Sequence, residues 1–135
     1  MTVYIAHNYG AREMLKSLVI PAIESKGLKV SSRWILEDMS TCPRLTCANA
    51  DIADLRKADI LLFFSSDYNS KPGRGKHVEL GYALALDKIV VLVGENFDAC
   101  VFYSLPEIVT FSNLELALKF LGGINGTRMV PENRS

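Results

Sequence analysis

Residues 73–94 read GRGKHVELGYALALDKIVVLVG. Two glycines precede a mostly apolar segment over residues 76–86, which we predict to be a helix, and residues 88–93 (KIVVLV) form a continuous apolar run. A short run of this kind is typical of a strand buried on both faces of a parallel sheet. The stretch therefore predicts a loop, a helix and a buried strand in succession, which is the building unit of an α/β fold.

The same alternation extends over the rest of the chain. Residues 60–64 (ILLFF) repeat the pattern of a buried strand, and residues 11–26 have a helical period in which Pro21 is expected to produce a kink. We predict the other strands at residues 2–6, 28–34 and 108–111, the other helices at 48–57 and 113–121, and a loop or lid at 35–45. The sequence thus predicts a doubly wound α/β fold of the flavodoxin-like or Rossmann-like type, with about five mainly parallel strands and helices on both faces.

Length and composition indicate one domain. The chain has 135 residues, of which 49% are hydrophobic, and this is enough to form a real core. From Gly122 onward the sequence (GGINGTRMVPENRS) is polar and rich in glycine and proline. We therefore expect a single domain over residues 1–121 and a flexible polar tail over residues 122–135.

Charge and cysteine content narrow the classes of partner. The 15 basic and 15 acidic residues cancel, which argues against a nucleic acid polymer or a membrane surface and favours a small molecule. No secretory signal and no apolar stretch of about 20 residues is evident, so we expect a soluble, cytoplasmic protein. The three cysteines are scattered, so we expect packing thiols and neither a disulfide framework nor a zinc site, and no metal or cofactor is implied.

In parallel sheets, ligands bind beyond the carboxyl ends of the strands, which here are followed by residues 4–10, 65–76 and 94–103. Within the second stretch, Gly73 and Gly75 allow backbone amides to approach a ligand, and the following helix directs its positive end to the same place. Arg74 and Lys76 would strengthen a phosphate site. A turn without a ligand, with both cations solvated, is an equally open interpretation.

Glu79 is the only carboxylate in an otherwise apolar helix. We place it one turn into that helix, where the dipole would keep it ionised. Its apolar neighbours Val78, Leu80 and Tyr82 indicate a buried helix and therefore a carboxylate that faces a pocket. The alternative is a glutamate that only stabilises the first helical turn.

Three residues in their local sequences carry a resemblance to a known family. They are Tyr4 in the first strand, Asp51 in ADIADLRKADILLFF and Glu79 in the ELG segment that follows the two glycines. Over residues 3–121 the chain resembles the nucleoside 2-deoxyribosyltransferases and the related nucleotide N-hydrolases. The resemblance implies that Glu79 is the nucleophile, that Asp51 assists at the substrate and that Tyr4 orients the glutamate.

The implied reaction is cleavage of the N-glycosidic bond of a 2′-deoxynucleoside or its 5′-monophosphate, with transfer of the deoxyribosyl group to another nucleobase or to water. A carboxylate that stabilises or traps an oxocarbenium-like centre suits this chemistry, and a second carboxyl group can protonate the leaving base. The resemblance also implies a homodimer or a larger homo-oligomer, in which a neighbouring subunit completes the site. The residues that we expect to contact substrate are Ala6, His7, Asn8, Asp59, Gly73, Arg74, Gly75 and Lys76.

Other interpretations of these residues stay open. Asp51 and Asp54, three positions apart on one predicted helix, could both face solvent, and Tyr4 could be a core residue. Asp59 could cap or turn the chain. Relatives that act on monophosphates carry Ser or Thr just before the two glycines, where this chain has Lys71 and Pro72. A non-catalytic nucleotide-binding module of the same fold is the alternative function.

Overall fold

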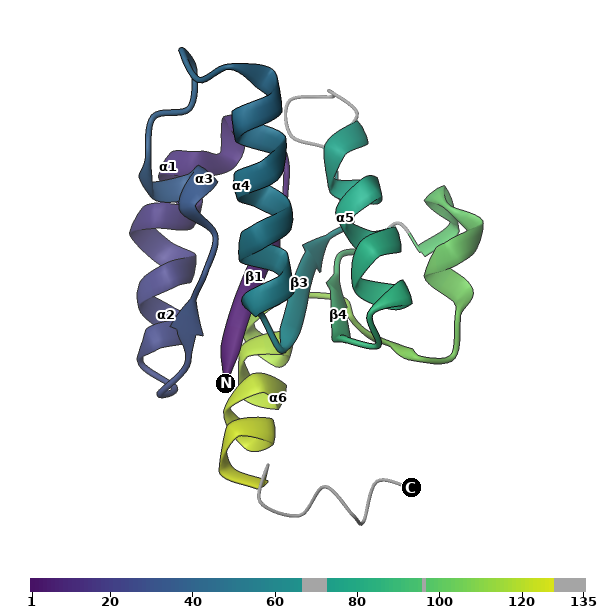
Figure 1. The fold of residues 1–135 in the computed structure, drawn as a ribbon. Helices are drawn as coiled ribbons and strands as arrows, with labels where there is room; N and C mark the ends of the chain where they lie inside the picture. The colour runs from purple at the N-terminus through teal and green to yellow at the C-terminus, as the bar shows by residue number, and fades with distance from the viewer. Residues whose placement is uncertain (67–72, 96, 128–135) are drawn as a thin grey trace.

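The computed structural model describes residues 1–66, 73–95 and 97–127. Five strands form one sheet in the order β2-β1-β3-β4-β5, and every pairing is parallel (Figure 1). This arrangement confirms the predicted doubly wound α/β fold. The strands are β1 (Thr2–Ala6), β2 (Lys29–Val30), β3 (Ile60–Phe64), β4 (Ile89–Val93) and β5 (Ile108–Phe111).

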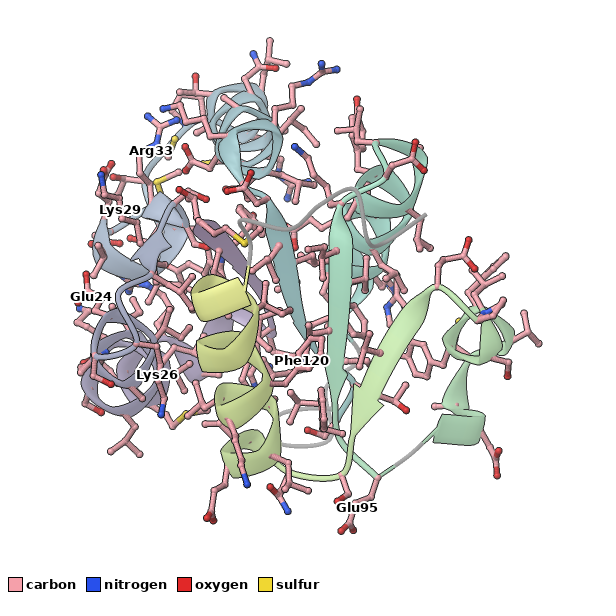
Figure 2. The ribbon with its side chains drawn as sticks, turned by 90° about the horizontal axis from the view of Figure 1, so that it is seen from below. Glu24, Lys26, Lys29, Arg33, Glu95 and Phe120 are labelled. Carbon is pink, nitrogen blue, oxygen red and sulfur yellow. The ribbon has the colours of Figure 1, made fainter. Side chains whose placement is uncertain are left out.

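Helices cover both faces of the sheet. In Figure 1, α4 (Arg44–Lys57) and α5 (Arg74–Ala85) lie side by side in front of the strands, and α6 (Leu114–Thr127) lies behind them, in contact with α2 (Ile20–Glu24). Figure 2 shows Phe120 between α6 and the strands, where its ring packs 5.3 Å from that of Phe111. The short helical segments are η1 (Tyr9–Ala11), α1 (Arg12–Met14), η2 (Leu15–Val19), α3 (Arg33–Leu36), η3 (Phe97–Ala99) and η4 (Val101–Ser104).

The central strands are as buried as their sequences predict. All five residues of β3 are buried, and β3 pairs along its whole length with β4, from Ile60 opposite Ile89 to Phe64 opposite Val93. Side chains of both strands are covered from both faces, which is why neither shows polar alternation. Because the strand order reverses direction at β1, the carboxyl ends of β1 and β3 form the switch point where such sheets bind ligands.

The helix predicted over residues 11–26 is divided. A π-helical segment over Leu15–Val19 separates α1 from α2, and Pro21 stands in the first turn of α2. Proline has no N–H to donate to the carbonyl of the preceding turn, so the regular hydrogen-bond pattern is interrupted there. The irregularity expected at Pro21 therefore takes the form of a π-helical turn.

The second predicted strand was too long. Only Lys29 and Val30 form β2, and residues 33–36 are helical instead of extended. Further along the edge of β1, side chains replace the strand: the Ser32 hydroxyl accepts the Ile5 N–H at 2.7 Å, and the Trp34 indole donates to the Ile5 carbonyl at 3.0 Å. Both polar groups of Ile5 are thus satisfied without a longer strand.

Two other helix boundaries also differ from the prediction. The loop predicted at residues 35–45 contains part of α3, and α4 already begins at Arg44. The predicted helix end at Leu121 was wrong, because α6 continues through Gly122 and Gly123 to Thr127. A Cβ atom on Gly122 would lie 3.2 Å from the Lys26 side chain, so a small residue allows α6 to pass close to the chain that follows α2. The rest of the predicted tail, residues 128–135, lies outside the described residues.

Candidate active site

A cavity of about 670 Å³ opens beside the carboxyl ends of β1 and β3. Its size falls within the range of small-molecule sites. Segments distant in sequence surround it: the chain after β1, the region from α3 to the middle of α4, and the first part of α5. The lining residues are His7, Asn8, Tyr9, Gly10, Trp34, Met39, Cys47, Asp51, Gly73, Arg74, Gly75, Lys76 and Glu79.

Tyr4 and Glu79 are directly bonded. The Tyr4 side chain is fully buried in the sheet, and its hydroxyl donates a hydrogen bond to Oε2 of Glu79 in the cavity. Burial, with the charge of Glu79 as a second cause, raises the pKa of Tyr4 above its usual value, so the phenol remains a donor. The structure therefore brings together two of the three residues to which the resemblance assigns catalysis.

Glu79 is not easily ionised, contrary to the sequence-based expectation. Burial raises its pKa to about 8, the charge of Asp51 adds to the rise, and the bond from Tyr4 opposes it. The helix begins at Arg74, so Glu79 lies beyond the first turn, where the dipole acts most strongly. The premise of an all-apolar buried helix was also wrong, because Val78 is 62% exposed and Tyr82 37% exposed.

Asp51 faces the same cavity from α4. Its Oδ1 is buried and has no hydrogen-bond partner among the described residues. Burial, followed by the charge of Asp54, raises the pKa of Asp51 to about 6, although Arg33 acts in the opposite direction. An unpaired buried carboxyl oxygen directed at a cavity is able to bind a polar group of a ligand.

Asp54 has a structural role and does not face solvent. It is buried, and its carboxylate accepts hydrogen bonds from the backbone N–H and the Nε of Arg33 at 3.1 and 2.9 Å. Its backbone carbonyl accepts a third bond from the Ser31 hydroxyl at 2.9 Å. Asp54 therefore ties α4 to the chain after β2, and Asp51 is left to face the cavity.

His7 and Asn8 form the wall that follows β1. The His7 ring stacks on Phe64 with 4.8 Å between centroids, and its Nδ1 accepts the N–H of Asn8 at 2.7 Å. Burial, together with the positive charge of Lys76, lowers the pKa of His7 to about 4. The imidazole is therefore neutral at pH 7, with its proton on Nε2 because Nδ1 accepts a bond.

The two glycines of the GRG loop differ in their surroundings. A Cβ atom on Gly73 would lie 2.6 Å from Cε of Lys76 and 2.7 Å from Oδ1 of Asn8, so any side chain there would clash. A Cβ atom on Gly75 would meet nothing within 4 Å. Gly73 is thus required by packing, while Gly75 and the exposed Arg74 border open space at the start of α5.

Lys76 is not a solvated loop cation. It is only 2% exposed, and its ammonium donates to the carbonyls of Phe64 at 2.8 Å and Ser66 at 3.0 Å. The cation also lies 5.5 Å from the centre of the Phe63 ring. Lys76 therefore holds the chain at the carboxyl end of β3 and contributes a buried positive charge to the cavity.

Two predicted contact residues do not reach the cavity. Ala6 is fully buried in β1 and is not part of the lining. Asp59 precedes β3, where its carboxylate accepts the N–H of Thr2 at 2.9 Å. The start of a parallel strand lies at the opposite edge of the sheet from the cavity, so the structure places Asp59 away from the other predicted contact residues.

Sequence reasoning missed the part of the cavity between β2 and α4. Trp34, Met39 and Cys47 line it, and exposed Tyr9 lies 6.3 Å from the Trp34 ring. Trp34 was assigned to a strand and Met39 to a loop. The sequence signal was the tryptophan, a large side chain with a donor that needs a partner, in a segment without clear strand alternation.

The third predicted stretch, residues 94–103, contributes no described side chain to the cavity lining. Its Tyr103 is buried, and its hydroxyl lies 2.8 Å from Nε2 of His77. The Nδ1 of His77 donates to the Gly73 carbonyl at 2.8 Å. His77 therefore fastens the GRG loop to η4. Lys71 and Pro72, where relatives carry Ser or Thr, lie outside the described residues.

The described parts of the chain show neither a cluster of metal ligands nor a helix that could span a membrane. Within residues 1–66, 73–95 and 97–127, no three His, Cys, Asp or Glu side chains gather as a metal site would require. Across these same ranges, no helix combines the length and apolar character needed to cross a membrane.

Known proteins resemble this chain in family profile and in fold. The family profile described as nucleoside 2-deoxyribosyltransferase matches residues 4–126. The solved structure of a CMP N-glycosidase, BcmB, from Clostridium botulinum is similar, with a TM-score of 0.65 and 18% identity over 93% of this chain and 98% of that chain. A 2-desoxiribosyltransferase from Leishmania mexicana gives a TM-score of 0.68 and 18% identity over 90% of this chain and 97% of that one. No curated protein matches the chain significantly.

Proposed function

Because the chain belongs to the nucleoside 2-deoxyribosyltransferase family, we propose that it cleaves the N-glycosidic bond of a 2′-deoxynucleoside or its 5′-monophosphate, with Glu79 as the nucleophile. The observation that carries the proposal is the hydrogen bond from Tyr4 to Glu79, in a cavity that Asp51 also faces. A buried tyrosine that holds one carboxylate oxygen leaves the other oxygen available to the sugar.

In the first step, an oxygen of ionised Glu79 bonds to C1′ as the bond from C1′ to the base nitrogen breaks. The electron pair of the broken bond leaves with the base, and a deoxyribosyl ester remains on the enzyme. The Tyr4 hydroxyl fixes the orientation of the carboxylate during this step. In the second step, a base or a water molecule attacks C1′ and releases Glu79.

We assign protonation of the leaving base to Asp51. Its raised pKa of about 6 leaves about a tenth of the group protonated at pH 7, and its unpaired Oδ1 is available to a ring nitrogen or an exocyclic group. The neighbouring wall of Tyr9, Trp34 and Met39 offers apolar and aromatic surface to a planar base. When another base occupies this wall, the product is a new nucleoside, and when water does, the reaction is hydrolysis.

A 5′-phosphate would be bound at the start of α5. Gly75 is open there, Arg74 is exposed beside it, and the amides of the first helical turn point toward the same space. Lys76, which is buried and lines the cavity, adds a positive charge that attracts an anion. We therefore include monophosphates among the proposed substrates.

The test is chromatographic. The purified protein is incubated with 2′-deoxynucleosides and their 5′-monophosphates, each with and without a second free base, beside a Glu79→Ala variant. Release of base in water identifies a hydrolase, and a new nucleoside formed only with the second base identifies a transferase. Equal inactivity of both proteins toward the whole panel would contradict the proposed reaction.

One observation favours a second candidate, a non-catalytic nucleotide-binding module. A Glu79 pKa of about 8 means that the carboxyl group is mostly protonated at pH 7 in the empty cavity, and a protonated carboxyl can donate to a sugar hydroxyl. This candidate predicts saturable nucleotide binding in calorimetry without any base release.

A further inference from the structure

Two cysteines, Cys42 and Cys47, flank the start of helix α4. Helix α4 begins at Arg44 with Pro43 as its N-cap, so Cys42 precedes the cap and Cys47 is the fourth helical residue. Side chains at these two positions commonly pack against each other across the first turn. The local structure therefore predicts that the two thiols meet.

The hydrogen bonds agree with this placement. The Met39 carbonyl accepts the N–H of Cys42 at 3.1 Å and the S–H of Cys47 at 3.8 Å. Both cysteines are free thiols and half-buried. Both cysteines therefore bond to the same carbonyl, which places them side by side, and the Cys42 thiol is also the main cause, ahead of burial, that raises the pKa of Cys47 to about 11.

This thiol pair borders the candidate active site. Cys47 and Met39 both line the cavity. Asp51 lies one turn beyond Cys47 on the same face of α4, because residues four positions apart share a helical face. A covalent change at Cys47 therefore occurs next to the carboxyl group to which we assign protonation of the base.

We propose that Cys42 and Cys47 form a redox-active dithiol, which closes into a disulfide on the wall of the cavity when it reacts with a small-molecule disulfide such as oxidised glutathione. Cys42, which lies outside the helix, attacks first as a thiolate, bonds to one glutathione sulfur and expels the other as a thiolate. Cys47 then loses its proton, attacks the Cys42 sulfur and expels the second glutathione. The two cysteines are oxidised by two electrons, and two reduced glutathiones result.

The disulfide changes the cavity wall. A sulfur–sulfur bond of about 2 Å removes the thiol that Cys47 donates to Met39 and fixes the segment before α4 to its first turn. We expect kcat/KM to fall about tenfold, because small displacements of catalytic groups cost large factors in rate. This consequence, unlike the disulfide itself, rests on the proposed function.

Peptide mass spectrometry tests the disulfide independently of activity. Trypsin cleaves after Arg44, so Cys42 and Cys47 lie on different peptides that stay joined only if the bond has formed. The folded protein is incubated with oxidised glutathione, alkylated and digested without reduction. We expect the linked pair in the wild type and in Cys100→Ser, its absence in Cys42→Ser and Cys47→Ser, and its loss after treatment with dithiothreitol.

Stable glutathione adducts without the linked pair, or a bond to Cys100 instead, would overturn the proposal. The activity measurement compares oxidised wild type with oxidised Cys42→Ser, in which Cys47 is retained. We expect only the wild type to lose turnover and to recover it on reduction. If the reduced protein turns over no substrate, the proposed function fails, while the linked peptides still decide the thiol chemistry.

Discussion

The hydroxyl of Tyr4, in β1, donates a hydrogen bond to Glu79, in α5, across 75 positions of sequence. The bond connects a fully buried strand residue with a helix residue that lines the cavity. Because the strand is held by pairing on both sides, the donor has little freedom to move. The sheet therefore fixes the orientation of the carboxylate, which is what a nucleophile needs before substrate arrives.

Glu79→Gln should bind nucleoside but release no base. Glutamine keeps the shape and can still accept the Tyr4 hydrogen bond, but it cannot form the glycosyl ester, so we expect turnover to fall by about 10³-fold or more. Base release is followed by chromatography and binding by calorimetry. Glu107→Gln, a change at an exposed residue of the same type, is the matched control. Turnover of the Glu79→Gln variant near the wild-type rate would remove Glu79 from the nucleophile role.

Tyr4→Phe should lower kcat about tenfold at neutral pH while KM changes little. The Tyr4 hydrogen bond lowers the pKa of Glu79, so its loss raises that pKa further above 8, and each unit removes about tenfold of the ionised form at pH 7. Steady-state kinetics at pH 7 measure the effect. A rise in KM at constant kcat would mean that the hydroxyl contacts substrate instead of orienting Glu79.

The pH dependence of kcat/KM should be bell-shaped. Activity needs Glu79 ionised, with a pKa of about 8, and Asp51 protonated, with a pKa of about 6. The product of these two fractions is nearly constant between the two values and falls tenfold per pH unit on either side. We therefore expect a broad optimum between about pH 6 and pH 8.

The Asp51→Asn variant tests whether the loss of activity at alkaline pH comes from deprotonation of Asp51. Asparagine has no proton to lose, so the alkaline decline should disappear and activity should rise until Glu79 is ionised. The rate at the optimum should fall by about 10²-fold, because the acid is lost. The exposed residue Asp98 offers a control, Asp98→Asn, which should keep both limbs. An alkaline limb that persists in the Asp51→Asn variant would assign it to another group.

The fold was predictable because the central strands are buried on both faces. The segments around Leu62 and Val91 are short and apolar throughout, which is typical of a strand buried on both faces. Both strands lie where the sequence predicts them. The length of the edge strand β2 was not predictable. Beside Ile5, the side chains of Ser32 and Trp34 bond to the backbone N–H and carbonyl in place of a strand. Such tertiary bonds leave no periodic pattern in the sequence.

The residues that follow β1 and that begin α5 were predictable as part of the cavity, and the wall between β2 and α4 was not. Resemblance places Tyr4, Asp51 and Glu79, and the structure brings all three to one cavity or its border. The pKa of Glu79 was predicted in the wrong direction, since helix position is visible in a sequence and burial by distant segments is not. Lys76 was misjudged for the same reason, because its carbonyl partners come from the end of β3.

Arg74→Ala should weaken monophosphates more than nucleosides. Arg74 is exposed at the start of α5, and loss of one charged contact to phosphate should raise KM for monophosphates about tenfold and leave nucleosides within about twofold. Lys119→Ala, which removes an exposed cation from α6, controls for net charge. Equal effects on both substrate classes would argue against a phosphate site at the GRG loop.

Glu79 should also lower the stability of the protein as pH rises. Its folded-state pKa is raised to about 8 from an ordinary 4.5, so between these values the native protein retains a proton that the unfolded chain has released. Stability therefore falls as pH rises through this range, by about 1.4 kcal/mol per unit at most. A glutamine side chain at this position carries no such proton, so the Glu79→Gln variant escapes this loss.

We expect the free energy of unfolding of Glu79→Gln to exceed that of the wild type by roughly 3 kcal/mol more at pH 8 than at pH 5, after allowance for the partly exposed position of the side chain. Asp51, with its raised pKa, and His7, with its lowered pKa, also titrate in or near this range, but both are present in each protein and largely cancel in the difference. Urea unfolding at the two pH values, beside Glu107→Gln, measures the effect. Parallel pH dependences for variant and wild type would show that the Glu79 carboxylate is not destabilised by burial, and the alkaline part of the predicted activity profile would then need another origin.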